Sequence, residues 1–242
     1  MGKSITIVIP AFNEEGNIEA SYQKTKDALL ELGLDHEIFL VNDGSVDKTG
    51  EVIRRLESKD SQIRAIHHSV SKGIGYAYKT VVKRAKAELF FLMPGDDDLE
   101  SSELKKILTA KDDKDVVIPY LENFQIRPLK RRFFSKTFTN TINFLFGMEL
   151  KYYNGPVLHF TKNLREIEIK SNRYTYQAEI LIRLIKQKRC SFAYVGINSN
   201  ERKLGQSKAV KIANFIDVGL FIIRMFFEIY FRQKLKCFFK VA

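Results

Sequence analysis

The chain has 242 residues, of which 45% are hydrophobic and 29% charged, and this composition excludes a predominantly disordered protein. The formal net charge of +11 is unevenly distributed: residues 1–126 carry 17 Lys and Arg against 22 Asp and Glu, whereas residues 127–242 carry 23 against 7. A basic second half predicts a surface for anions such as phosphates, lipid headgroups or nucleic acid. The two cysteines are far apart, which argues against a disulfide framework or a zinc site.

Short apolar runs alternate with amphipathic stretches through the first half of the chain. The runs are rich in β-branched or aromatic residues and predict strands at residues 5–9, 37–41, 63–67, 88–93 and 115–119. The stretches between them predict helices near residues 15–32, 48–58, 74–86 and 101–108. Such alternation predicts an α/β fold with a mostly parallel sheet flanked by helices.

The second half has a different pattern. Residues 130–147 mix basic residues with an apolar stripe at helical spacing, formed by Phe134, Phe138, Ile142, Leu145 and Phe146. A helix is predicted at residues 174–188, a strand at 192–197, and a long apolar helix at about 208–236. We therefore expect one α/β domain over residues 1–207 and a C-terminal amphipathic helical segment over 208–242.

Polar and acidic residues follow four of the predicted strands. In a parallel sheet ligands bind at the carboxyl ends of the strands, so residues 10–15, 42–45, 71–75 and 94–98 are expected to form one site. Asp96, Asp97 and Asp98 are adjacent carboxylates, and a site that keeps all three ionised usually holds a cation. Oxygen ligands suit Mg²⁺ or Mn²⁺, which would bridge a substrate diphosphate. The alternative is an acidic turn that precedes the helix at Ser101.

The segments at residues 9–15, 41–49 and 72–77, followed by the Asp cluster, resemble in order and spacing the family 2 glycosyltransferases of the GT-A (Rossmann-like) fold. The resemblance covers roughly residues 4–208 and implies a nucleotide-sugar donor, a divalent metal and inversion at the anomeric carbon. It places Pro10, Ala11, Glu14 and Asp43 in the nucleoside pocket, with Lys72 and Gly73 near the nucleobase or diphosphate. The run Pro94-Gly95-Asp96-Asp97-Asp98 departs from the usual D-x-D motif. Two alignments with that motif are open, and both select Asp96 and Asp98 as metal ligands and catalytic residues, with Asp97 a secondary donor contact.

A basic segment further along, Arg202-Lys203-Leu204-Gly205-Gln206-Ser207-Lys208, resembles the R-x-x-G-x-S-K segment of polyprenyl-phosphate glycosyltransferases such as dolichol-phosphate mannose synthase. A glycine between two cations suits a lid in which Arg202 and Lys208 clamp the donor phosphates. The alternative is a solvated basic loop.

Glu179 precedes an amphipathic stretch and is a candidate general base for transfer to a hydroxyl. Its alternative role is that of an acid favoured by a helix N-terminus. A lipid-phosphate acceptor would lessen the need for a base, because its oxygen is already anionic.

Residues 212–231 are long enough to span a bilayer, but Asp217, Arg224 and Glu228 interrupt them on one helical face. Arg224 and Glu228 are spaced so that they are able to pair. A helix lying in the membrane interface, with this polar stripe turned outward, avoids the cost of burying charge in lipid. Packing against protein, dimerisation and a true span are the alternatives. Residues 130–147 are a second candidate interfacial element, and an ordinary core helix is the alternative.

The sequence therefore predicts a metal-dependent inverting transferase at the cytoplasmic membrane face, acting on a UDP- or GDP-sugar, with a polyprenyl phosphate as acceptor. One rival transfers the sugar to a hydroxyl of a glycan or glycolipid. The other is a non-catalytic anion- or nucleic-acid-binding protein, although the chain contains no RNA-binding motif and we expect no nucleic-acid partner. A homo-oligomer is compatible with the sequence.

Overall fold

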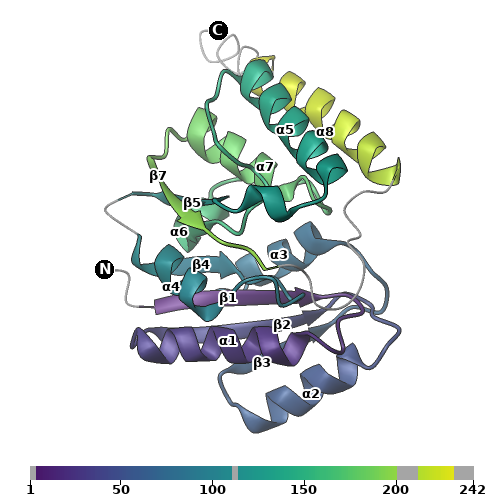
Figure 1. Ribbon diagram of the computed structural model, residues 1–242, viewed down its shortest axis with the longest axis vertical. Coiled ribbons are helices and arrows are strands. Elements are labelled where there is room, and N and C mark those ends of the chain that lie inside the picture. Colours follow the sequence, from purple (N-terminus) through teal and green to yellow (C-terminus); the bar gives the residue numbers. More distant parts are fainter. Residues whose placement is uncertain (1–3, 111–113, 201–211, 232–242) are drawn as a thin grey trace, which may run out of the picture.

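The computed structural model describes residues 4–110, 114–200 and 212–231, and Figure 1 shows their arrangement around a seven-stranded sheet. The strand order is β3-β2-β1-β4-β6-β5-β7. The strands are β1 (Ser4–Ala11), β2 (Asp35–Asn42), β3 (Ile63–His67), β4 (Leu89–Leu92), β5 (Val116–Leu121), β6 (Leu158–Phe160) and β7 (Phe192–Ile197). The helices are α1 (Ile18–Glu31), α2 (Thr49–Lys59), α3 (Ile74–Val82), α4 (Ser101–Thr109), α5 (Leu129–Phe146), α6 (Thr161–Arg165), α7 (Tyr176–Ile182) and α8 (Ile212–Tyr230), with a 3₁₀ turn at Phe124–Ile126 and a π-helical turn at Arg183–Gln187.

The predicted α/β architecture is confirmed. Strands β3, β2, β1 and β4 run parallel, and β5 runs parallel to β7. Along β1 the buried side chains alternate between two layers: Ile7 and Ile9 pack with α1, α2 and α4, whereas Val8 packs with α3 and α7. Helices thus cover both faces of the sheet, which is why its central strands are apolar on both sides.

Strand β6 was not predicted. It is antiparallel to both β4 and β5 and joins the two parallel parts of the sheet. Its central residue, His159, is buried, and this burial lowers the pKa of the imidazole to about 3, so the ring is neutral. Three residues with a histidine at the centre give no periodic signal, and only the tertiary pairing reveals the strand.

Helices in both halves of the chain differ from the prediction in detail. The predicted helix at 174–188 consists of α7 followed by the π-helical turn, and α3 ends at Val82 rather than at residue 86. In α5, Ile142 and Phe146 are buried, as the predicted apolar stripe requires, but Phe134 is exposed.

Helix α8 lies beside α5 (Figure 1), and Tyr230 of α8 donates a hydrogen bond to the Leu145 carbonyl oxygen over 2.9 Å. None of the helices in the described parts of the chain has the length and apolarity needed to cross a membrane. The predicted domain boundary at 207/208 lies outside the described residues and stays a prediction.

Candidate functional site

The carboxyl ends of β1, β2 and β4 meet at one edge of the sheet. The amide of Asp43, after β2, donates to the Ala11 carbonyl oxygen over 2.9 Å. Gly95, after β4, packs so closely against β1 that a Cβ atom there would lie 2.4 Å from the Pro10 carbonyl oxygen. A side chain at Gly95 would therefore push the acidic run, residues 96–98, away from the predicted nucleoside pocket.

The Asp43 carboxylate organises residues 68–73, which we call the donor loop because it carries Lys72 and Gly73, the residues predicted to bind the donor. It accepts hydrogen bonds from the amides of Lys72 and Gly73 at 3.0 and 2.8 Å, from the Ser71 hydroxyl at 2.9 Å, and lies 2.7 Å from the His68 Nδ1 atom. Burial alone would raise the pKa of Asp43, but these hydrogen bonds outweigh it and hold the pKa below its ordinary value. Asp43 therefore stays ionised and fixes the loop that carries Lys72 and Gly73.

Glu14 begins the segment that leads from β1 into α1. Its amide donates to the Thr49 hydroxyl over 2.8 Å, and its carboxylate accepts from the Asn17 side chain over 2.8 Å. These contacts join the β1 and β2 loops, and the structure thus brings together the predicted residues Pro10, Ala11, Glu14 and Asp43.

The three carboxylates of the acidic run are not equivalent. Asp97 is buried in a left-handed conformation (φ 61°), with its amide donating to the Ser21 hydroxyl and its carboxylate 2.7 Å from Lys24 Nζ. Asp96 and Asp98 are partly exposed. Asp97 is thus turned toward α1, whereas Asp98 lines the cavity described next and Asp96 lies close enough to Arg131 to raise its pKa.

A cavity of about 100 Å³ adjoins the acidic run and is lined in part by two arginines that were not predicted as site residues. Asp98, Arg127, Arg131 and Tyr152 line it, together with residues at the ends of β5 and β7. Arg127 donates to the Tyr152 hydroxyl over 2.6 Å. Burial, followed by the neighbouring charge of Arg127, lowers the pKa of Arg131, whereas Asp98 and Asp96 raise it. Two arginines thus lie within electrostatic reach of the acidic run.

Arg127 precedes α5 and Arg131 lies in its first turn. They were not predicted as site residues because the apolar stripe is the clearest pattern in this segment. Their spacing of four residues, in the basic half of the chain, is the signal that was available. The chemistry of this lining suits an anion beside the arginines and a cation beside the aspartate.

Glu179 is fully buried on α7 and bound by cations. Its carboxylate accepts hydrogen bonds from Arg183 at 2.7 Å, from Arg224 at 3.0 Å and from the Ser171 amide at 2.7 Å. Burial alone would raise its pKa, but the bonds from Ser171 and Arg183 dominate and lower it. A general base needs access to the acceptor and a pKa near the working pH, so this environment does not favour that role.

The polar stripe of α8 faces the protein. Arg224 bonds to Glu179, and Glu228 bonds to Lys170 and Arg183 over 2.7 and 2.6 Å. The prediction that this polar stripe turns outward was therefore wrong, and Arg224 and Glu228, which were able to pair with each other, each bind partners on other elements. Arg202 and Lys208 lie outside the described residues, and their phosphate-clamping role stays a prediction.

Within the parts of the chain that the structure describes, no group of three or more His, Cys, Asp or Glu side chains is arranged to hold a metal ion. If Asp96 and Asp98 hold a metal ion, as the sequence predicts, oxygens of a bound substrate would complete its ligand set. That ligand set is typical of Mg²⁺, which commonly binds through one or two carboxylates and substrate phosphates.

Comparison with known proteins identifies the family. Residues 6–170 match glycosyl transferase family 2. The chain is 29% identical over 137 residues to a dolichol-phosphate mannosyltransferase of Pyrococcus furiosus, covering 54% of this chain and 38% of that protein. It is 25% identical over 208 residues to an undecaprenyl-phosphate 4-deoxy-4-formamido-L-arabinose transferase of Photorhabdus laumondii, covering 85% and 63%. The chain thus spans less than two thirds of the length of these relatives.

Solved structures support the same fold. Glucosyl-3-phosphoglycerate synthase of Mycobacterium tuberculosis, in complex with Mn²⁺, UDP and glucosyl-3-phosphoglycerate, superimposes with a TM-score of 0.66 at 16% identity, covering 94% of this chain and 80% of that one. The predicted GT-A fold is confirmed, and the chain belongs to glycosyltransferase family 2.

Proposed function

We propose that this glycosyltransferase transfers a sugar from a UDP- or GDP-sugar to a polyprenyl phosphate, with inversion at the anomeric carbon. The observation that carries the proposal is the cavity in which Asp98 faces Arg127 and Arg131. It offers carboxylates for a metal–diphosphate on one side and guanidinium groups for an anionic acceptor on the other. The named activities of the Pyrococcus and Photorhabdus relatives support the same acceptor class.

On the donor side, Pro10, Ala11, Glu14 and the donor loop would hold the nucleoside. Asp96 and Asp98 would hold Mg²⁺ or Mn²⁺, and such an ion neutralises the charge that develops on the leaving diphosphate. Asp97 would act indirectly, because its contact with Lys24 fixes the turn that presents its two neighbours.

On the acceptor side, Arg127 and Arg131 would bind the lipid phosphate. Guanidinium groups match the geometry of phosphate oxygens and form strong charge-assisted hydrogen bonds. A phosphate monoester is already anionic at neutral pH, so its oxygen can attack the anomeric carbon without a general base. The enclosed position of Glu179 is consistent with such an acceptor.

A lipid acceptor requires access to a membrane, and α8 offers an apolar surface for it. Its exposed large apolar side chains recur three or four residues apart on one face: Ile216, Leu220, Ile223, Phe227 and Phe231. Leu129, Phe133 and Phe144 of the neighbouring α5 are also exposed, and Lys130 and Lys136 are exposed cations on the same helix. We propose that this α5–α8 face lies on an anionic bilayer, with the cytoplasmic face as its expected location.

The test is a transfer assay with the purified chain, Mn²⁺, and UDP-glucose or GDP-mannose as alternative labelled donors. Undecaprenyl phosphate in detergent is the lipid acceptor, and undecaprenol and an oligosaccharide are the hydroxyl acceptors. We expect labelled lipid from the phosphate alone, and we expect Asp96→Asn to reduce its formation by about a hundredfold or more, because a bound metal contributes several kcal/mol to transition-state stabilisation.

Two results would contradict the proposal. Transfer to undecaprenol or the oligosaccharide, with none to the phosphate, would favour the hydroxyl-acceptor rival. Full activity of the Asp96→Asn protein would show that this carboxylate does not hold the metal. Asp27→Asn, at an exposed position of α1, is the matched control for the loss of one carboxylate.

A further inference from the structure

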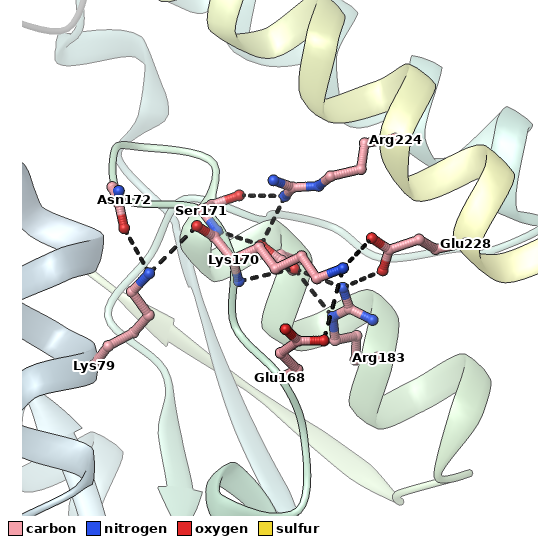
Figure 2. Close-up of polar contacts among 9 residues, drawn as sticks. Lys79, Glu168, Lys170, Ser171, Asn172, Arg183, Arg224 and Glu228 are labelled. Carbon is pink, nitrogen blue, oxygen red and sulfur yellow. Dashed lines mark hydrogen bonds and ion pairs between the residues drawn. The ribbon is translucent and has the colours of Figure 1, made fainter.

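A cluster of charged side chains joins α8 to the interior of the protein, and Figure 2 shows its members converging from four parts of the chain. We define the charge cluster as Lys170, Glu179, Arg183, Arg224 and Glu228. Arg183 Nη2 bonds both acids, lying 2.7 Å from Glu179 and 2.6 Å from Glu228. Glu179 is fully buried and Arg183 nearly so, and buried charges are stable only when they are paired and hydrogen-bonded.

The charge cluster also holds a loop. We define the support loop as residues 170–173, between β6 and α7. The amides of Lys170 and Ser171 both donate to Glu179, at 3.2 and 2.7 Å. Arg224 of α8 donates to the Ser171 hydroxyl over 2.9 Å through the same Nη2 atom that contacts Glu179. The conformation of the support loop is therefore fixed by α7 and α8 together.

The other side of the support loop packs on the donor loop. Gly73 has φ 95°, and a Cβ atom there would lie 2.4 Å from the Asn172 carbonyl oxygen. The same oxygen accepts a hydrogen bond from the Tyr76 amide over 3.1 Å, at the start of α3. Lys79, one turn further along α3, donates to the Asn172 side chain over 2.5 Å and to the Lys170 carbonyl oxygen over 3.3 Å.

An unbroken series of contacts thus connects α8 to the predicted nucleoside pocket. It runs from Arg224 to Ser171, from Asn172 to Gly73, and from the Gly73 amide to Asp43 over 2.8 Å. Because the backbone of the support loop touches Gly73 directly, a shift of that loop must displace the donor loop or open a gap beside it.

We propose that Arg224, Glu228 and Glu179 are positioning residues for donor binding, which hold the support loop against the donor loop and so make nucleotide affinity depend on the docking of α8. The inference rests on the proposed function, because it assumes that the donor loop binds a nucleotide. It assigns Glu179 a positioning role instead of the role of general base.

The decisive variant is Arg224→Met. It removes the guanidinium from the support loop, while Glu179 keeps Arg183 and two backbone amides, so no buried carboxylate is left without a cation. The probes are UDP and GDP, each with Mn²⁺, titrated calorimetrically into the full chain. We expect the Kd of the nucleotide that binds to rise about tenfold, the size of effect that residues orienting a contact group commonly have.

The controls separate positioning from general destabilisation. Arg224→Lys should restore part of the affinity, because its ammonium can reach Ser171 or Glu179. Arg55→Met removes the same side chain from an exposed ion pair with Glu19 on the other side of the sheet and should leave the Kd unchanged. If Arg224→Met does not fold, Ser171→Ala deletes only the hydroxyl that Arg224 contacts, and it should raise the Kd by a smaller factor.

The variant Glu179→Gln distinguishes the two roles of that residue. A positioning residue predicts a raised nucleotide Kd with kcat of transfer little changed, whereas a general base predicts a large fall in kcat at unchanged Kd. An unchanged Kd in Arg224→Met, or in Ser171→Ala if the former does not fold, overturns the inference and leaves the proposed function standing. Failure of the wild-type chain to bind UDP or GDP overturns both.

Discussion

In the first half of the chain, the site is formed by loops that directly follow the parallel strands β1, β2 and β4. In the second half, it is formed by side chains that converge from α5, the loop before β6 and the ends of β5 and β7. On the parallel side one carboxylate, Asp43, fixes a whole loop through backbone amides. In the second half, guanidinium groups line the cavity and also supply hydrogen bonds within the charge cluster. The proposed donor side is therefore set by sheet geometry, while the proposed acceptor side depends on long side chains held by tertiary packing.

The largest effect expected to separate the two halves comes from removing a cation from the cavity. We expect Arg131→Met to lower kcat/KM for undecaprenyl phosphate by about a hundredfold, since hydrogen bonds to charged groups contribute about 1.5–3 kcal/mol each. The Kd of the donor nucleotide should stay the same, because Arg131 belongs to the acceptor side. Initial rates at varied acceptor concentration, with calorimetry for the nucleotide, measure both quantities.

Arg132→Met is the matched control, since it removes the neighbouring arginine of α5, which does not line the cavity. If Arg131→Met weakened nucleotide binding as much as acceptor use, donor and acceptor binding could not be assigned to separate halves of the chain.

A smaller effect is expected on the α5–α8 face. Phe227 is 57% exposed, and burying a phenylalanine side chain contributes about 1.5–3 kcal/mol. We therefore expect Phe227→Asp to lower affinity for phosphatidylglycerol-containing vesicles by about tenfold or more, as measured by co-sedimentation.

Leu30→Asp tests the same change on α1 of the parallel half, where Leu30 is 59% exposed, and it should leave vesicle binding unchanged. If Phe227→Asp instead converted a dimer to a monomer in sedimentation velocity and bound vesicles normally, the face would be an interface between two copies of this chain.

The same contrast explains which parts of the fold and of the candidate site could be predicted from the sequence. Strands β1 to β4 and the loops after them were predicted because each strand is a short segment containing β-branched or aromatic residues and bounded by turn residues, and because parallel strands place the following residues at a common edge. Asp43 and the acidic run therefore appeared together from the sequence alone. Their unequal roles did not, since the contact of Asp97 with Lys24 depends on how α1 packs.

In the second half the signals were weaker for physical reasons. The antiparallel β6 is three residues long, and Arg127 and Arg131 acquire a role only when Asp98 and Tyr152 are brought beside them. The charges on α8 were visible, but their partners Glu179, Lys170 and Arg183 lie some 40 to 60 residues earlier in the chain. No local pattern specifies such pairings.

The smallest effect is expected at Asp60, where a substitution tests whether the amino edge of the parallel strands affects stability without affecting the site. Asp60 lies between α2 and β3, at the edge opposite to the site, and accepts hydrogen bonds from Lys26 and Tyr22 over 2.8 and 2.6 Å. The hydrogen bond from Lys26, followed by that from Tyr22, lowers the pKa of Asp60 from 3.8 to about 2. Because the pKa is lower in the folded state, the stabilisation is complete well above pH 3.8 and disappears as the pH falls through about 2.

We expect Asp60→Asn to lower the free energy of unfolding by about 1 kcal/mol at pH 7, a value reduced for the partial solvent exposure of Lys26. Urea unfolding at pH 7, 4.5 and 2.5 measures the difference, which should shrink toward zero at the lowest pH, while transfer activity at pH 7 stays at the wild-type level. A loss of nucleotide affinity in this variant would show that the amino edge also influences the site, and the donor side could then no longer be attributed to the carboxyl-edge loops alone.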